Sequence, residues 1–196
     1  MNDALLIFIK NPQLGKVKTR LAATEGDERA LHIYRELLRH TREVTRQAAA
    51  TRYLYYSQHI DEQDDWQASD FTKRVQAPGD LGHRMASAFE EVLAQHDRAV
   101  IVGSDCAQLR IEHVQQAFEA LDSYDVVLGP ADDGGYYLLG MKTLHRELFE
   151  GIDWSTDAVA DQTRRAVANK SLILTELPTL SDIDYIEDWE KHGWEL

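Results

Sequence analysis

Residues 98–109 read Arg98-Ala-Val-Ile-Val-Gly-Ser-Asp-Cys-Ala-Gln-Leu109, and this stretch decides the fold. The apolar run 99–102 is rich in β-branched residues, which is typical of a strand buried inside a parallel sheet. Gly103 and Ser104 interrupt the run, so Asp105 stands just beyond the carboxyl end of the strand. Ligands of open α/β sheets bind at that edge, where a lone carboxylate can hold Mg²⁺ or Mn²⁺. The alternative is that Asp105 only caps the following turn.

Short apolar runs alternate with amphipathic segments over the whole chain. Runs of strand length occupy residues 4–9, 53–56, 72–76, 99–102, 124–129, 136–139 and 171–175. Apolar residues at steps of three and four, together with capping residues, predict helices over about 28–48, 80–95, 111–121 and 157–168 and after residue 184. We therefore expect one α/β domain over residues 1–196, with a mainly parallel sheet and right-handed crossovers.

The bulk composition limits the classes of function. The formal net charge is −13, so the surface as a whole repels nucleic acid, and a polyanionic ligand must meet a local basic patch. Cys106 is the only cysteine, which excludes a disulfide within the chain. The N-terminus lacks the basic start of a signal peptide, and no apolar run approaches the ~18 residues of a membrane span. We expect a cytoplasmic protein with no nucleic-acid partner.

A basic segment follows the first apolar run. Residues 10–22 read Lys-Asn-Pro-Gln-Leu-Gly-Lys-Val-Lys-Thr-Arg-Leu-Ala and place four cations, Lys10, Lys16, Lys18 and Arg20, within eleven residues. A loop at the carboxyl end of a strand is a suitable place for a phosphate chain. Gly15 would allow close backbone approach, and the cations would neutralise the phosphate charge. The alternative is a solvated basic loop.

A second turn supplies further candidates. Pro78-Gly79 is a turn signal, and Asp80 fits the N-cap of the next helix. The amides of Gly79 and Gly82, with the guanidinium of Arg84 in the first turns of the helix, could face a nucleotide. A plain turn followed by a helix start explains the same residues equally well.

The segment Asp132-Asp-Gly-Gly135 lies between two expected strands. Adjacent glycines remove side chains where a ligand or a second backbone comes close, and Asp132 and Asp133 flank that gap. Asp-Gly-Gly is also a common hairpin turn, and the two interpretations are compatible.

Two later segments carry helix-start signals. Ser155 or Thr156 is a natural N-cap for the helix over 157–168, and Asp157 suits its first turn. Asp184 with Glu187 three residues on fits a capping-box pattern, which is the structural alternative to any functional role for Asp184.

Four segments, in order, resemble one family: Lys10–Ala22, Pro78–Met85, Gly103–Cys106 and Gly129–Gly140. The chain resembles the bacterial glycosyltransferase-like proteins often labelled radical SAM/selenodomain-associated transferases, of the nucleotide-diphospho-sugar transferase superfamily. Its first loop is more distantly similar to that of phospholactate and molybdenum-cofactor guanylyltransferases, without their paired glycines. The resemblance implies a single-domain GT-A fold, a three-layer α/β/α sandwich. Ala107 departs from the family, which usually has proline there.

The resemblance also implies roles for individual residues. Asp105 and Asp184 match two aspartates that hold a divalent metal, Mg²⁺ or Mn²⁺. Lys18, Arg20 and Asp105 are expected to act in catalysis. The expected substrate-binding residues are Lys10, Gly15, Lys16, Gly79, Gly82, Arg84, Asp133, Gly134, Gly135, Trp154 and Thr156. Of these, Trp154 and Thr156 belong to a Trp-Ser-Thr element to which the resemblance gives no specific role.

Three functions fit these residues. The first is nucleotidyl transfer, in which a small phosphorylated acceptor attacks the α-phosphate of a nucleoside triphosphate and releases pyrophosphate. The second is glycosyl transfer from a nucleotide sugar. The third is nucleotide binding without turnover, against which the retention of Asp105, Asp184 and the basic loop argues. Cys106 is expected to be no nucleophile, because an acidic neighbour disfavours the reactive thiolate. The base, the sugar, the acceptor and the oligomeric state are left open.

Overall fold

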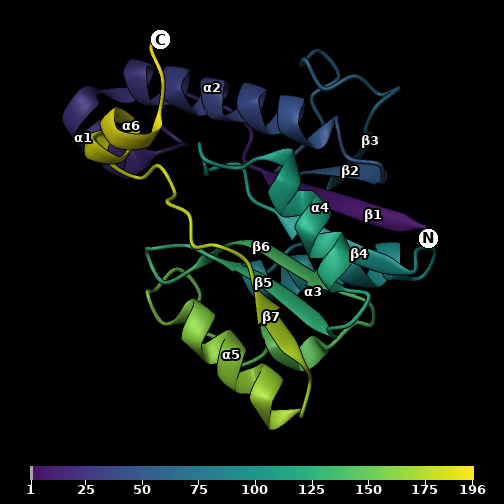
Figure 1. The fold of residues 1–196 in the computed structure, drawn as a ribbon. Helices are drawn as coiled ribbons and strands as arrows, with labels where there is room; N and C mark the ends of the chain where they lie inside the picture. The colour runs from purple at the N-terminus through teal and green to yellow at the C-terminus, as the bar shows by residue number, and fades with distance from the viewer. Residues whose placement is uncertain (1) are drawn as a thin grey trace.

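The computed structural model describes residues 2–196, and its centre is a seven-stranded sheet (Figure 1). The strand order is β3-β2-β1-β4-β6-β5-β7. The strands are β1 (Asp3–Ile9), β2 (Thr51–Tyr56), β3 (Thr72–Val75), β4 (Arg98–Val102), β5 (Val126–Pro130), β6 (Tyr136–Met141) and β7 (Leu174–Glu176). β6 runs antiparallel to β4 and β5, and all other neighbours pair in parallel. The mainly parallel sheet expected from the sequence is confirmed.

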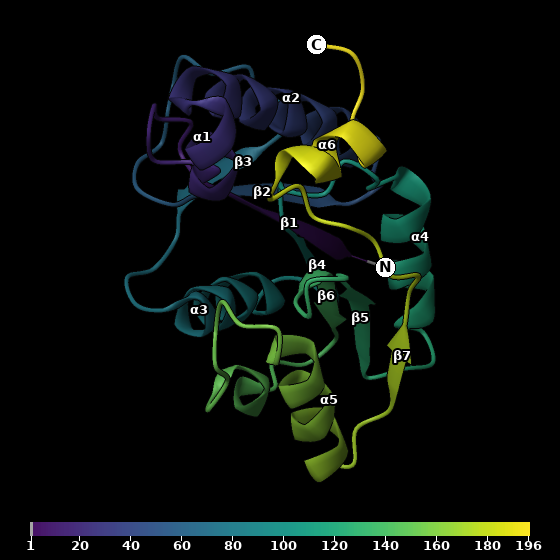
Figure 2. The ribbon, with the colours of Figure 1, turned by 90° about the vertical axis from the view of Figure 1, so that its left-hand side faces the viewer.

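Helices cover both faces of this sheet (Figure 2). They are α1 (Thr19–Glu25), α2 (Asp27–Thr45), α3 (Leu81–Leu93), α4 (Ile111–Ala120), the 3₁₀ turn η1 (Arg146–Phe149), α5 (Val159–Asn169) and α6 (Ile186–His192). Leu5 and Ile7 of β1 pack on the face covered by α2 and α4. Ala4 and Leu6, which point the other way, pack on the face covered by α3 and α5. The result is the expected three-layer α/β/α arrangement.

Local details differ from the sequence-based expectation. The short helix α1 and the turn η1 were not expected, because seven and four residues are too few to show a helical period. Strand β7 begins at Leu174 rather than residue 171. Helix α5 begins after Ala158, and neither Ser155 nor Thr156 is its N-cap. The Thr156 hydroxyl instead accepts a hydrogen bond from the Ala158 amide, one step before the helix.

The topology brings distant segments to one edge of the sheet. Parallel strands β1 to β4 all end there, and the loops that begin at Lys10, Ser57, Gln76 and Gly103 leave from it. The turn before β6 also lies there, because β6 is antiparallel to β4. None of the helices within residues 2–196 combines the length and the apolar character that a membrane crossing needs.

Candidate functional site

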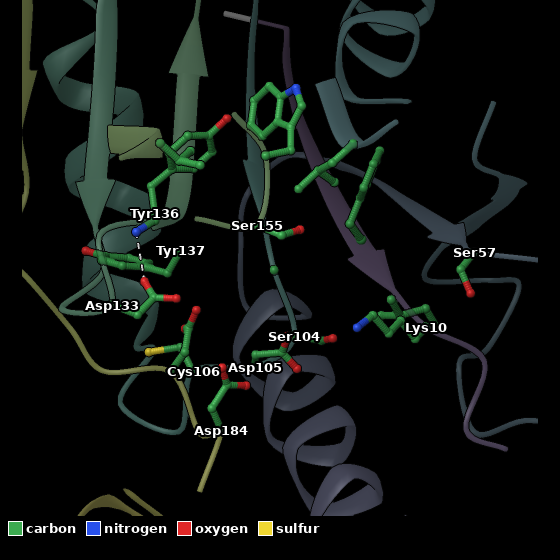
Figure 3. A pocket seen from close by; sticks show the side chains of 18 of the residues that line it. Lys10, Ser57, Ser104, Asp105, Cys106, Asp133, Tyr136, Tyr137, Ser155 and Asp184 are labelled. Carbon is green, nitrogen blue, oxygen red and sulfur yellow. Dashed lines mark hydrogen bonds between the residues drawn. The ribbon is translucent and has the colours of Figure 1, made fainter. Parts of the chain in front are cut away.

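A cavity of about 630 Å³ opens along this carboxyl edge. It is lined by the basic loop, the end of β4, the start of β6 and the segment before α5. Figure 3 shows that Asp105, Cys106, Asp133 and Asp184 gather in one part of it, whereas Lys10 and Ser57 lie in another. The sequence-predicted residues that line it are Lys10, Lys16, Lys18, Arg20, Arg84, Asp105, Asp133, Gly135, Trp154, Thr156 and Asp184.

Lys18 joins the two aspartates that the resemblance singled out. Its Nζ lies 2.8 Å from Asp105 Oδ1 and 3.5 Å from Asp184 Oδ1, and its side chain is only 5% exposed. Arg20 Nη1 donates to the second oxygen of Asp184 at 2.8 Å. Asp105 and Asp184, 79 positions apart in sequence, therefore contact the same ammonium group.

The charges in this cluster stabilise one another. Burial opposes the charged form of Lys18, but the pKa of its ammonium is still raised, because Asp105 and Asp184 outweigh the burial. Burial likewise acts to raise the pKa of Asp105, but Lys18 holds that pKa below its usual value. Asp182 differs: burial, and then repulsion from Asp105, raise its pKa to about 7. Lys18 and Asp105 thus form an ion pair beside Asp182, whose carboxyl group is harder to ionise.

The structural alternatives for the two aspartates can now be judged. The Asp105 side chain makes its contact with Lys18 and makes no capping hydrogen bond within residues 2–196. Helix α6 is capped by Asp188, whose Oδ2 accepts from the amides of Asp184 and Tyr185. The capping-box interpretation of Asp184 with Glu187 is therefore wrong. Capping by Asp188 leaves the carboxylate of Asp184 free to contact Lys18 and Arg20.

Three other cations at the cavity have no acidic partner. Within the described part of the chain, no carboxylate lies within 4.0 Å of the charged nitrogens of Lys10, Lys16 or Arg84. All three also line an adjoining recess of about 240 Å³, together with Asn11, Ser57 and Gln58. In a chain of net charge −13, unpaired cations converging on one recess indicate an anion site. The basic loop thus divides into paired and unpaired cations, a division its sequence did not show.

The opposite wall is built from the β5–β6 turn and the segment before α5. A Cβ added to Gly134, whose φ is +88°, would lie 2.1 Å from the Asp157 carbonyl oxygen, and Gly134 O accepts from the Ala160 amide. The two backbones therefore form one wall in which a side chain at Gly134 does not fit. Asp133 Oδ1 accepts from the Gly135 amide at 2.8 Å, which holds the turn (Figure 3).

Replacing Gly134 with alanine should destabilise the fold strongly. Left-handed backbone strain costs roughly 1–3 kcal/mol, and overpacking costs roughly 1–3 kcal/mol more. The control is Gly151→Ala, because Gly151 has φ +67° but an added Cβ meets nothing within 4 Å. Urea unfolding should show a loss for Gly134→Ala that exceeds the loss for Gly151→Ala by at least about 1 kcal/mol. Equal losses would contradict the tight wall.

Four glycines expected to touch a ligand do not line the cavity. Gly134 is required by the backbone of Asp157, as described above. A Cβ on Gly82 would lie 2.6 Å from Trp154 Nε1 and 2.7 Å from the Phe149 carbonyl, so Gly82 makes room for the Trp154 ring. Gly15 and Gly79 lie in turns with positive φ. Close packing or a turn therefore explains these four glycines, and contact with a substrate stays a prediction for them.

Cys106 is buried, and its surroundings disfavour the reactive thiolate. Its side chain is free of any disulfide, and burial, with the charge of Asp182, raises the pKa of the thiol to about 12. The carboxylate effect expected from the sequence is present, but burial is the larger cause. We expect a thiol-specific reagent to label native Cys106 far more slowly than unfolded Cys106, and Cys106→Ser to keep most activity. Rapid labelling of the native chain would show that the thiol is accessible.

Three further residues at the site were not identified from the sequence. The buried Tyr34 hydroxyl accepts from the Lys10 amide at 2.8 Å and lies 3.2 Å from Ser104 Oγ, so it ties the ends of β1 and β4 together. Gln76 Nε2 donates to the carbonyls at the ends of β1 and β2. Asp182 lines the cavity two residues before Asp184. None of the three gave a signal in the sequence, where Gln76 fell inside the strand expected over residues 72–76 and only the structure ends β3 at Val75.

The residues fit a divalent metal in their donor chemistry. Asp105 and Asp184 offer only carboxylate oxygens, which Mg²⁺ and Mn²⁺ prefer. Over residues 2–196 no group of three or more His, Cys, Asp and Glu side chains is arranged to hold an ion. Two neighbouring carboxylates repel each other without a cation between them, and here Lys18 and Arg20 supply the positive charge. Two carboxylates of suitable chemistry are thus brought together around an ammonium group.

The fold and the cavity can be compared with known proteins. A family model described as an uncharacterized protein conserved in bacteria, DUF2064, matches residues 39–156. The chain belongs to this family. A crystal structure from Desulfovibrio desulfuricans G20, of a protein provisionally assigned to the nucleotide-diphospho-sugar transferases, is 30% identical with a TM-score of 0.87. The match covers 95% of this chain and 84% of that one.

More distant structures share the fold alone. The inositol-1-phosphate CTP transferase of T. maritima is 11% identical with a TM-score of 0.61, covering 96% of this chain and 91% of that one. Rv0371c of Mycobacterium tuberculosis H37Rv, in a complex with manganese, is 12% identical with a TM-score of 0.59, and both chains are covered completely. No curated protein matches the chain. The fold is therefore that of the nucleotide-diphospho-sugar transferases, as expected.

Proposed function

We propose that the chain is a nucleotide-dependent transferase that moves a nucleotidyl group from a nucleoside triphosphate to a small phosphorylated acceptor. The observation that carries the proposal is the recess with three unpaired cations, Lys10, Lys16 and Arg84, beside the Lys18–Asp105 pair. A triphosphate is a ligand whose charge and length suit such a recess. The fold shared with a CTP transferase also supports the proposal of nucleotidyl transfer.

In the proposed reaction, a phosphate oxygen of the acceptor forms a bond to the α-phosphorus, and the bond from that phosphorus to the bridging oxygen breaks. The electron pair leaves with pyrophosphate, so charge develops on the leaving group. Lys10, Lys16 and Arg84 would hold the leaving phosphates, and Lys18 and Arg20 would contact the reacting ones. The wall around Asp133 and Trp154 would hold the organic part of the acceptor.

A divalent metal would add to this charge stabilisation. When bound, Mg²⁺ or Mn²⁺ neutralises phosphate charge and holds phosphate oxygens in place. Asp105 and Asp184 are the residues that would hold it. The manganese complex of Rv0371c, which shares the fold, supports metal use in this proposal.

Glycosyl transfer from a nucleotide sugar is the second candidate. The wall formed by residues 133–137 and 154–157 presents Tyr136, Trp154, Asp133 and Asp157 to the cavity, but no lysine or arginine. Aromatic rings and carboxylates suit a sugar ring better than a second phosphate. The provisional assignment of the Desulfovibrio relative to the nucleotide-diphospho-sugar transferases also supports it.

A turnover assay separates these functions. The chain is incubated with Mg²⁺, each ribonucleoside triphosphate or nucleotide sugar, and a small-molecule cell extract as the source of acceptors. Nucleotidyl transfer predicts pyrophosphate from one triphosphate, whereas glycosyl transfer predicts a free nucleoside diphosphate from a nucleotide sugar. Binding without either product would favour the non-catalytic alternative. A single domain over residues 1–196 and a cytoplasmic location stay predictions.

A further inference from the structure

Lys18 occupies an unusual position for a lysine. Its backbone is left-handed, with φ 46° and ψ 48°, directly before helix α1. Its ammonium group lies between Asp105 and Asp184 and is almost completely buried. Arg20 contacts the remaining oxygen of Asp184. The two carboxylates that suit a divalent ion are therefore already neutralised by cations of the chain itself.

This arrangement opposes the binding of a metal alone. An ion at Asp105 and Asp184 would lie a few ångströms from the Lys18 ammonium, and like charges at that distance repel strongly where burial limits screening. The ion would have to displace Lys18, whose buried charge would then need another partner. Within the cavity, the remaining acids are Asp182, whose pKa is raised to about 7 by burial so that it is a poor partner for an ammonium group, and the exposed acids of the opposite wall.

A polyphosphate removes this obstacle. Bound at Lys10, Lys16 and Arg84, it would bring acidic oxygens into the cavity that Lys18 also lines. These oxygens could replace Asp105 and Asp184 as the ionic partners of the Lys18 ammonium group. The two carboxylates would then be free for the ion, and each ligand would favour the binding of the other.

We propose that Lys18 couples the two ligands, keeping Asp105 and Asp184 closed to a divalent ion until a polyphosphate offers its ammonium group another partner. The inference rests on the proposed function, because it takes a polyphosphate as the ligand of the basic recess. In this coupling, Lys18 acts on metal binding through the two carboxylates, in addition to the contact with the reacting phosphates proposed above. A lysine that merely braces the fold would lower metal binding when removed, since the carboxylates would lose their arrangement.

The test measures Mn²⁺ binding to the full chain by the electron paramagnetic resonance of the free ion. Lys18→Met should bind Mn²⁺ at least about ten-fold more tightly than the unchanged chain, because the competing cation is gone. The matched control is Lys16→Met, which removes an exposed cation of the same loop that contacts neither aspartate. It should change the affinity for Mn²⁺ alone by less than about three-fold. Equal or weaker Mn²⁺ binding by Lys18→Met, with its far-ultraviolet spectrum intact, would overturn the proposal.

A second measurement uses the unchanged chain, so it does not depend on the folding of a variant. Mn²⁺ is titrated with and without inorganic pyrophosphate, and a titration without protein corrects for the ion–pyrophosphate complex. Pyrophosphate should tighten Mn²⁺ binding at least about ten-fold. Pyrophosphate that binds without this effect would overturn the coupling alone. Failure of pyrophosphate to bind at all, judged by calorimetry, would overturn the coupling and the proposed function together.

Discussion

Replacing Asp105 with asparagine should lower pyrophosphate release by at least about 100-fold, the effect of removing one group that stabilises charge in a transition state. Asparagine keeps the shape of the side chain but removes the charge that faces Lys18 Nζ at 2.8 Å. The loss of stability should stay well below the roughly 3–5 kcal/mol of a broken buried pair. The reason is that the Asp105 side chain is 37% exposed and Lys18 keeps its contact with Asp184.

The control for this change is Asp161→Asn. Asp161 forms a surface ion pair with Arg164 and is 64% exposed, so its loss should leave both stability and product formation nearly unchanged. Both variants are compared by pyrophosphate release and by urea unfolding. An Asp105→Asn variant that keeps more than about half of the activity would show that the carboxylate serves only the local structure.

Replacing Lys16 or Arg84 with alanine should each weaken nucleotide binding by roughly 1.5–3 kcal/mol, the usual contribution of a hydrogen bond to a charged group. Both side chains line the recess, and neither has an acidic partner to lose within the described residues. Calorimetric titration with the nucleotide that the chain prefers measures the change. Arg20→Ala should weaken nucleotide binding as well, because Arg20 is one of the four cations of the basic loop. This variant is harder to interpret, since it also removes the ion-pair partner of Asp184.

The control for this pair is Lys191→Ala. Lys191 is an exposed cation at the end of α6, and it does not line the cavity. The substitution Lys191→Ala removes the same charge from the chain, so it corrects for long-range attraction between the protein and a polyanion. Unchanged affinity in both Lys16→Ala and Arg84→Ala would place the phosphates elsewhere.

Much of the fold followed from the sequence because each strand carries its own signal. The run before Gly103 is apolar throughout, and it is buried on both faces in the sheet. The place of β6 between β4 and β5 could not be predicted, because strand order depends on contacts between distant segments. Helix α1 could not be predicted either, because seven residues are too few to show a helical period. Leu21 of α1 instead packs against residues of α2 and α6, which is a contact between distant segments.

The sequence suggested which residues line the cavity but not how they pair, and their roles stay predictions. Charge density marked the loop that carries Lys16 and Lys18, yet the sequence could not show that Lys18 turns inward while Lys16 stays exposed. That difference depends on the left-handed backbone at Lys18 and on Asp184, which lies 166 positions later. The glycine motifs were ambiguous for a related reason. A glycine indicates that another group comes close to the backbone, and at Gly82 and Gly134 that group belongs to the protein itself.

The most direct test of the central claim is calorimetric titration of the unchanged chain with the four ribonucleoside triphosphates and a set of nucleotide sugars, each with Mn²⁺. This measurement needs no knowledge of the acceptor. The account predicts that at least one triphosphate binds with one molecule per chain, and that Lys16→Ala and Arg84→Ala weaken that binding while Lys191→Ala does not. Absence of binding by every member of the panel, or binding that is indifferent to Lys16 and Arg84, would contradict it.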